Sequence, residues 1–228
     1  MAQAPVKLAG RRLKTPRAAA IAGILFAVLY SMALVLIRLS IPTDASDRGA
    51  WLAGQSGTVS LALVLAPLAG IAFLWFIGVL RDRMAQLEDQ FFSTVFLGSG
   101  LLYLGLSFMS AALAGGLLAG YAADPGLVKS DVYFFARQVM YQINNVYALR
   151  MSSVFMISLA TIWLRTGTAP RVLVVLTYML ALGLLFSASL SFWLTFTFPL
   201  WVLAISVFIQ VENLRNPAPH AERSPETA

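Results

Sequence analysis

Residues 172–211 read VLVVLTYMLALGLLFSASLSFWLTFTFPLWVLAISVFIQV and contain no charged side chain over 40 positions. An α-helix rises about 1.5 Å per residue, so one helix of this length would measure about 60 Å. The hydrocarbon core of a bilayer is only about 30 Å thick. The stretch therefore predicts two membrane-spanning helices, over 172–188 and 192–211. We place the turn between them at the serine-rich residues 187–191, because serine hydroxyls compete for backbone hydrogen bonds and favour turns.

Three more segments without a charged residue, 18–37, 51–80 and 91–123, precede this one. They predict spans over 18–40, 57–80 and 92–121. The composition agrees, because 59% of the 228 residues are hydrophobic, 11% are charged and the mean hydropathy is +0.79. A soluble domain carries about 25% charged residues. The sequence therefore predicts an all-α protein that crosses a membrane several times.

A further span must include residues on both sides of Arg150. The uncharged stretch between Arg150 and Arg165 has 14 residues and would rise only about 21 Å, which is too short to cross. A span over 146–165 is long enough and places Arg150 about one turn inside the outer boundary. The prediction is then a six-helix integral membrane bundle within a single domain, residues 18–212. Polar tails, predicted to be disordered and cytoplasmic, cover 1–17 and 213–228.

The distribution of basic residues predicts the orientation. With six spans, both termini lie on one side, which carries eleven lysine and arginine residues, whereas the other side carries Arg48, Lys129 and Arg137. Basic residues accumulate on the cytoplasmic side of membrane proteins. We therefore expect both termini in the cytoplasm. The composition, with 13 arginines against 3 lysines and abundant alanine and leucine, indicates a GC-rich bacterial genome, so we expect the inner (plasma) membrane of a bacterium.

The segment before the fourth span predicts an amphipathic helix. Asp124-Pro125-Gly126 is a turn signal, and Ser130 is suited to cap a following helix. Apolar residues then recur at helical spacing on one face: Val132, Phe135, Val139, Ile143 and Val146. The polar side consists of Arg137, Gln138, Gln142, Asn144 and Asn145. We expect this helix to lie at the outer membrane interface.

Several classes of function are excluded or disfavoured by what the sequence lacks. There is no cysteine, and the single histidine, His220, lies in the C-terminal tail. No metal site and no cofactor is therefore expected, since bundle-bound haem, iron and zinc normally need imidazole or thiolate ligands. No Asp, Glu, Lys or His lies well inside a predicted span, so an enzyme or a carboxylate-driven proton pump is not expected. The net charge of +6 follows from topology, and no nucleic-acid partner is expected.

Arg150 is the most informative residue within a predicted span. One interpretation is that it snorkels to the interface or anchors a neighbouring helix. The other is that it forms an outward-facing vestibule with Arg38, Asn144 and Asn145, which would bind an anionic or polar ligand. Sequence alone does not show whether these helices are neighbours.

Small residues in the third span form the second feature of interest. Ala112, Gly116 and Gly120 recur at four-residue spacing, which lets helix backbones approach closely. This pattern indicates helix packing, either within the chain or at a seam between copies.

Two functions are compatible with these features. The favoured one is a non-enzymatic membrane subunit or scaffold, which contacts the lipid bilayer and packs as a homo-oligomer or with other membrane proteins. The alternative is a small transporter or channel-like protein with the outward vestibule. A cavity that reaches Arg150, Asn144, Asn145 or Arg38 would favour the alternative, whereas a fully packed bundle would weigh against it.

Overall fold

The computed structural model describes residues 15–42, 49–84, 90–187 and 192–215, which are almost entirely helical and include no strand. The long helices are α1 (Thr15–Ser40), α3 (Ser56–Met84), α4 (Gln90–Ala123), α6 (Leu149–Thr166), α7 (Arg171–Ser187) and α8 (Thr197–Arg215). The shorter elements are α2 (Ala50–Gly54), the 3₁₀ helix η1 (Pro125–Lys129), α5 (Asp131–Gln142), the π-helical segment η2 (Ile143–Ala148) and the 3₁₀ helix η3 (Phe192–Phe196).

Five helical stretches in the described part of the chain are long and apolar enough to cross a membrane. They cover 18–40, 56–81, 91–123, 131–166 and 193–212, and a shorter apolar helix covers 171–186. These stretches lie over the apolar runs of the sequence and indicate a multi-pass membrane protein. Of the turn expected within 187–191, residues 188–191 lie outside the described residues, and α7 ends at Ser187.

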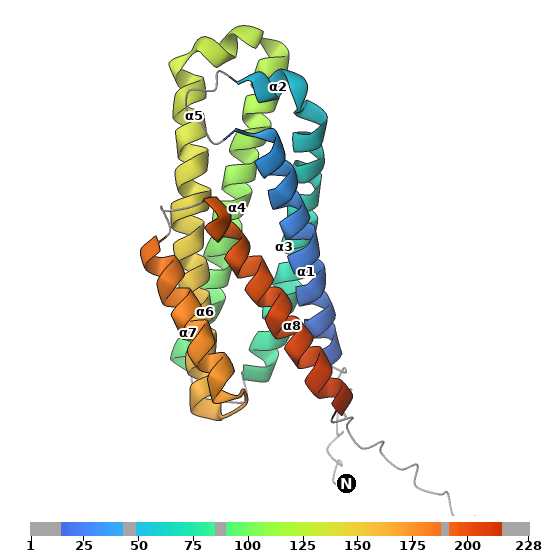
Figure 1. Cartoon of the computed structure of the whole chain (residues 1–228), viewed down its shortest axis with the longest axis vertical. Helices are drawn as coiled ribbons and strands as arrows, with labels where there is room; N and C mark the ends of the chain where they lie inside the picture. The colour runs from blue at the N-terminus through green and yellow to red at the C-terminus, as the bar shows by residue number, and fades with distance from the viewer. Residues whose placement is uncertain (1–14, 43–48, 85–89, 188–191, 216–228) are drawn as a thin grey trace, which may run out of the picture.

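The helices form one elongated bundle (Figure 1). The helix α3 packs along α1, α4 packs against α3, and α6 packs against α4, while α7 lies on the outer side of α6. The helix α8 crosses this assembly obliquely and packs against α1. At one end, the connection from α4 through η1 to α5 extends past α1, with α2 beside it. We call this end of the bundle the hairpin end.

The helix that begins at Asp131 is continuous with the predicted fourth span. It continues from α5 through η2 into α6 and ends only at Thr166. Neither glycine nor proline occurs between Asp131 and Thr166, so nothing in the sequence interrupts the helix. The expected division into an interfacial helix and a span from 146 to 165 is therefore replaced by one helix of 36 residues.

Local sequence signals define both ends of this long helix. The carboxylate of Asp124 accepts a hydrogen bond from the Gly126 N–H at 2.7 Å, and the Ser130 hydroxyl accepts one from the Tyr133 N–H at 3.4 Å. The predicted turn and N-cap are thus confirmed. At the other end, Gly167 adopts φ +64°, and its N–H bonds to the Trp163 carbonyl at 2.9 Å. Glycine is favoured at this position because it tolerates the left-handed conformation.

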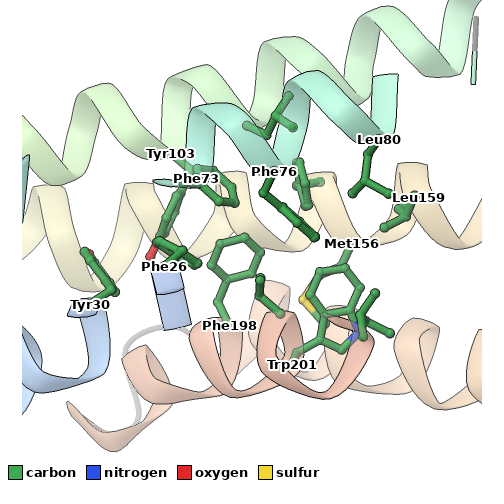
Figure 2. Close-up of a cluster of buried hydrophobic side chains, with 14 of the residues drawn as sticks. Phe26, Tyr30, Phe73, Phe76, Leu80, Tyr103, Met156, Leu159, Phe198 and Trp201 are labelled. Carbon is green, nitrogen blue, oxygen red and sulfur yellow. The ribbon is translucent and has the colours of Figure 1, made fainter. Parts of the chain in front are cut away.

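Aromatic side chains fill the centre of the bundle. The ring of Phe73 lies 4.6 Å from that of Phe26, 5.6 Å from that of Phe155 and 5.7 Å from that of Phe198, measured between centroids. Figure 2 shows the rings of Phe26, Phe73 and Phe198 gathered between the helices, with Tyr103 beside them. All four phenylalanines are fully buried. This aromatic cluster joins α1, α3, α6 and α8, and Tyr30 stacks on Phe26 with the ring centroids 5.4 Å apart.

Candidate ligand-binding cavity

A cavity of about 280 Å³ lies in the half of the bundle nearer the hairpin end. Its walls are α1, α4, α5 and η2, and α3 adds Ala66. Figure 1 shows α1 and α5 standing apart at this level, with α4 behind them. The polar lining consists of Tyr30, Arg38, Ser107, Ser110, Arg137, Gln138, Tyr141, Asn144 and Asn145. Small and aliphatic side chains form the other half, and no described residue of the lining is acidic.

Arg38 links three elements at the edge of the cavity. It lies near the end of α1, and its Nη2 donates to Asn145 Oδ1 at 2.8 Å and to Thr195 Oγ1 at 3.3 Å. These bonds hold α1 to η2 and to η3. Both of these bonds end on uncharged oxygens, and together they fix the orientation of the guanidinium group.

The π-helical segment positions two asparagines in the same wall. Asn145 is 4% exposed, and its Nδ2 donates to the Tyr141 carbonyl at 3.0 Å while its Oδ1 accepts from Arg38. Asn144 also lines the cavity. A π-helical segment changes the register of a helix by inserting an extra residue, and such segments are frequent at functional sites. Here it occurs where the lining carries its amide groups.

Arg137 also lines the cavity, although it was not predicted as a ligand-binding residue. It is 7% exposed, and its Nη2 donates to the Pro42 carbonyl at 2.6 Å. The sequence contained a signal for this position. Arg137, Tyr141 and Asn144 are spaced four and three residues apart, so they lie on one face of the helix. That polar face points into the bundle, whereas Phe135 and Val132 on the opposite side are 71% and 65% exposed.

Hydroxyl groups cover the part of the cavity next to the aromatic cluster. The Tyr30 hydroxyl donates to Ser107 Oγ at 3.2 Å, and the Ser107 hydroxyl donates to the Tyr103 carbonyl at 2.8 Å. Ser110 donates to the Met140 carbonyl at 3.1 Å and so joins α4 to α5. The cavity therefore ends on satisfied hydroxyls and packed rings.

Arg150 does not take part in this arrangement. Its side chain is exposed on the surface of α6, and Arg150 is not among the residues that line the cavity. The structure thus brings Arg38, Asn144 and Asn145 together, as the vestibule interpretation required, but with Arg137 where Arg150 was expected.

The small residues of α4 lie on another face. Ala112 and Gly116 are exposed, and Gly120 is half-buried, in a shallow apolar groove between α4 and the η1–α5 segment. A Cβ at Gly116 would meet no atom within 4 Å, whereas a Cβ at Gly120 would lie 2.9 Å from Leu127 Cδ2. Of these two glycines, only Gly120 packs closely against another side chain of the described chain.

The chemistry available in the cavity is binding by hydrogen bonds and charge. Two guanidinium groups, three amide side chains and several hydroxyls surround a space of about 280 Å³, at the lower limit of ordinary ligand pockets. No group of three or more His, Cys, Asp or Glu residues that could hold a metal ion occurs among the residues searched, which are those the structure describes. Comparisons with protein-family models, curated proteins and solved structures found no match to this chain.

Proposed function

We propose that this chain is a six-span protein of the bacterial inner membrane that binds an anionic or polar ligand in the cavity between α1 and α5. In this proposal both termini are cytoplasmic, the hairpin end faces outward, and the protein is a non-enzymatic small transporter in an outward-facing state. The observation that carries the proposal is the convergence of Arg38 and Arg137 with amide side chains in one cavity.

The charge distribution supports both the orientation and the site. Eleven basic residues on the side of the termini, against three on the other, favour cytoplasmic termini. Few basic residues then belong to the outward half of the chain, and two of them, Arg38 and Arg137, line the same cavity. Guanidinium groups offer paired N–H donors that match carboxylate and phosphate oxygens. Such a site favours an anion over a cation or a neutral solute.

The packing below the cavity supports access from one side only. The rings of Phe26, Phe73 and Phe198 pack against one another beneath Tyr30, and all three are fully buried. A ligand that enters from the hairpin end would stop at this cluster. Transport would then require the cluster to rearrange, as in an alternating-access cycle.

Cysteine labelling tests the proposal directly, since the chain contains no cysteine. Ala111 is a half-buried lining residue of α4, and Ala111→Cys places a thiol in the cavity. Ala122→Cys, at an exposed position on the same helix, is the matched control. Intact spheroplasts are treated with anionic or cationic membrane-impermeant methanethiosulfonates, and the ratio of the two rates is measured. We expect this ratio to be about tenfold higher at Ala111→Cys than at Ala122→Cys, because two nearby positive charges attract the anionic reagent.

Two results would contradict the proposal. Ala111→Cys that reacts only after the membrane is permeabilised would place the cavity on the cytoplasmic side. Equal rate ratios at Ala111→Cys and Ala122→Cys would show that the cavity does not select for negative charge. The variant Asn145→Asp gives an internal check, because it keeps an acceptor for Arg38 while adding a negative charge that should lower the ratio.

A second candidate function is a scaffold, and the open face of α4 favours it. Gly116 lies in an apolar groove, and a Cβ at this position would meet no atom of the described chain within 4 Å. If this face packs against a second copy, Gly116→Leu should shift the detergent-solubilised protein toward monomer in multi-angle light scattering, with unchanged thermal stability. An unchanged mass would show that this face of α4 is not an interface between two copies. Gly120→Leu is the contrasting variant, because it should destabilise the fold itself.

A further inference from the structure

The side of the cavity formed by α4 consists of small side chains on one helix face. Four residues, spaced so that they share this face, line the cavity: Ser107, Ser110, Ala111 and Ala114. Four residues before Ser107, the same face carries Tyr103, whose buried ring lies 4.5 Å from that of Phe198 between centroids. The cavity therefore begins where aromatic side chains on α4 are followed by serine and alanine.

Alanines from two further helices line the same space. Ala33 of α1 and Ala66 of α3 are lining residues, and both are buried, as is Ala114 of α4. We call Ala33, Ala66 and Ala114 the alanine wall. Their side chains are too short to fill the space between the three helices. By contrast, Ala69 of α3, three residues after Ala66, is fully buried in the packed aromatic core.

The helix from α5 to η2 supplies polar groups that are available to a ligand. Asn144 and Gln138 line the cavity, and their amide groups make no side-chain hydrogen bond with any residue that the structure describes. Each amide can both donate and accept. The hydroxyls of Ser107 and Ser110, on α4, already donate to main-chain carbonyls. The polar end of a ligand should therefore lie at α5–η2 and its apolar part at the alanine wall.

The volume of the cavity limits the size of the ligand. An apolar cavity of about 150 Å³ holds benzene, which has six non-hydrogen atoms. At the same ratio, a cavity of about 280 Å³ holds about eleven such atoms. One ring and one small polar group fit within this limit, whereas two fused rings with the same polar group exceed it.

We propose that the ligand is a small molecule of about ten non-hydrogen atoms, with a compact apolar body against the alanine wall and a carboxylate or amide group at Asn144 and Gln138. The alanine wall then determines which ligands fit. This inference rests on the proposed function, because it assigns a class of ligand to the same cavity. Carboxylates and amides share the carbonyl oxygen, and the test separates them by charge.

The first test measures protection of the Ala111→Cys thiol in the full chain, reconstituted in phosphatidylcholine nanodiscs. The thiol is labelled with neutral methyl methanethiosulfonate, and Ala122→Cys reports any effect of a probe on the bilayer alone. Benzoate should protect at concentrations at least about thirtyfold lower than propionate, because its ring removes more apolar surface from water. Naphthoate should protect no better than benzoate, since its second ring exceeds the space. Benzamide, which is uncharged, should also protect.

The second test changes the size of the cavity. Leucine at position 66 adds three carbon atoms that extend into the space. In the Ala111→Cys chain, Ala66→Leu should weaken protection by benzoate at least about tenfold and change that by propionate less than about threefold. Ala66→Leu should keep or raise the melting temperature, because it fills a void. The matched control Ala69→Leu should lower the melting temperature by several degrees, because it overpacks a filled core.

A third variant tests the polar end of the ligand. Asn144→Ala should weaken protection by benzoate and by benzamide about fivefold, which corresponds to the loss of one hydrogen bond. The melting temperature should not fall, since this amide holds no other described residue. Unchanged protection by both probes would contradict the assignment of Asn144 to the ligand.

Other outcomes overturn the inference. If propionate protects as well as benzoate, or if no probe protects, the alanine wall does not receive a ligand. The same holds if Ala66→Leu lowers the melting temperature as much as Ala69→Leu does, because there is then no space to fill. The reagent-charge ratio in spheroplasts decides the proposed function separately. Protection by benzamide but not by benzoate would support the alanine wall and contradict the preference for anions.

Discussion

Arg38 and Asn145, which are 107 residues apart in the chain, meet through a 2.8 Å hydrogen bond from the guanidinium Nη2 to the amide Oδ1. The same asparagine donates from its Nδ2 to the Tyr141 carbonyl, so both ends of its amide are used. This pair joins α1 to the π-helical segment and fixes one wall of the cavity. It also gives the means to separate stability from ligand binding.

Asn145→Leu should destabilise the protein more than Asn145→Asp does. Leucine removes the acceptor of a hydrogen bond from a charged group, and we expect a loss of about 1.5–3 kcal/mol in the free energy of unfolding. Aspartate loses the donor to the Tyr141 carbonyl but keeps an acceptor for Arg38, so its loss of stability should be smaller, while the added negative charge should lower anion binding. Unfolding in a denaturing detergent titration measures the first effect. Equal stability of both variants would mean that this bond does not hold α1 to η2.

A second pair of residues holds α2 to the long helix. Trp51 Nε1 donates to the Tyr133 hydroxyl at 3.1 Å, and both side chains are buried. Tyr133→Phe leaves the indole N–H without this acceptor and should cost about 1–3 kcal/mol. The double variant Trp51→Phe/Tyr133→Phe should cost less than the sum of the two single changes, because it leaves no orphaned donor. Additive losses in a double-mutant cycle would argue against coupling between these two residues.

Glycine at position 23 permits the close approach of α1 and α8. A Cβ there would overlap Ser206 Oγ and would lie 2.8 Å from Phe76 Cδ2. We expect Gly23→Ala to destabilise the bundle by about 1–3 kcal/mol, although alanine favours helices. The matched control is Gly78→Ala in α3, where a Cβ would meet nothing within 4 Å. That variant should be neutral or slightly stabilising by helix propensity. Thermal unfolding that ranks the two variants in the opposite order would contradict the α1–α8 contact.

Much of the fold could be predicted from local sequence chemistry. Long uncharged runs gave the positions of the apolar helices, and Asp124 and Ser130 gave the turn and the start of the helix at Asp131. These features depend on hydropathy and on capping groups close in sequence. The length of the helix from 131 to 166 was missed, because the polar residues before 146 were assigned to a separate interfacial helix although no helix-breaking residue is present.

The direction in which polar residues point could not be predicted in the same way. Periodicity places Arg137 and Asn144 on one side of a helix, but it does not say whether that side faces an interface or the interior. Nor does any single helix show that α1 lies beside η2, so the pairing of Arg38 with Asn145 required the tertiary structure. Arg150 follows Asn144 by six residues, which corresponds to about 120° around a helix, so the two were poorly placed to share a wall.

The last prediction concerns Arg150, which is exposed on α6 and does not line the cavity. In the proposed topology, its long side chain can reach the headgroup region while its methylenes stay against lipid. We therefore expect Arg150→Gln to change the free energy of unfolding by no more than about 0.5 kcal/mol. The anion preference of Ala111→Cys labelling should also be unchanged, whereas Arg38→Gln, the matched change inside the cavity, should reduce it severalfold. If Arg150→Gln reduced this preference as much as Arg38→Gln does, Arg150 would have to act on the ligand site, and the assignment of Arg38 and Arg137 as its two cationic groups would be incomplete.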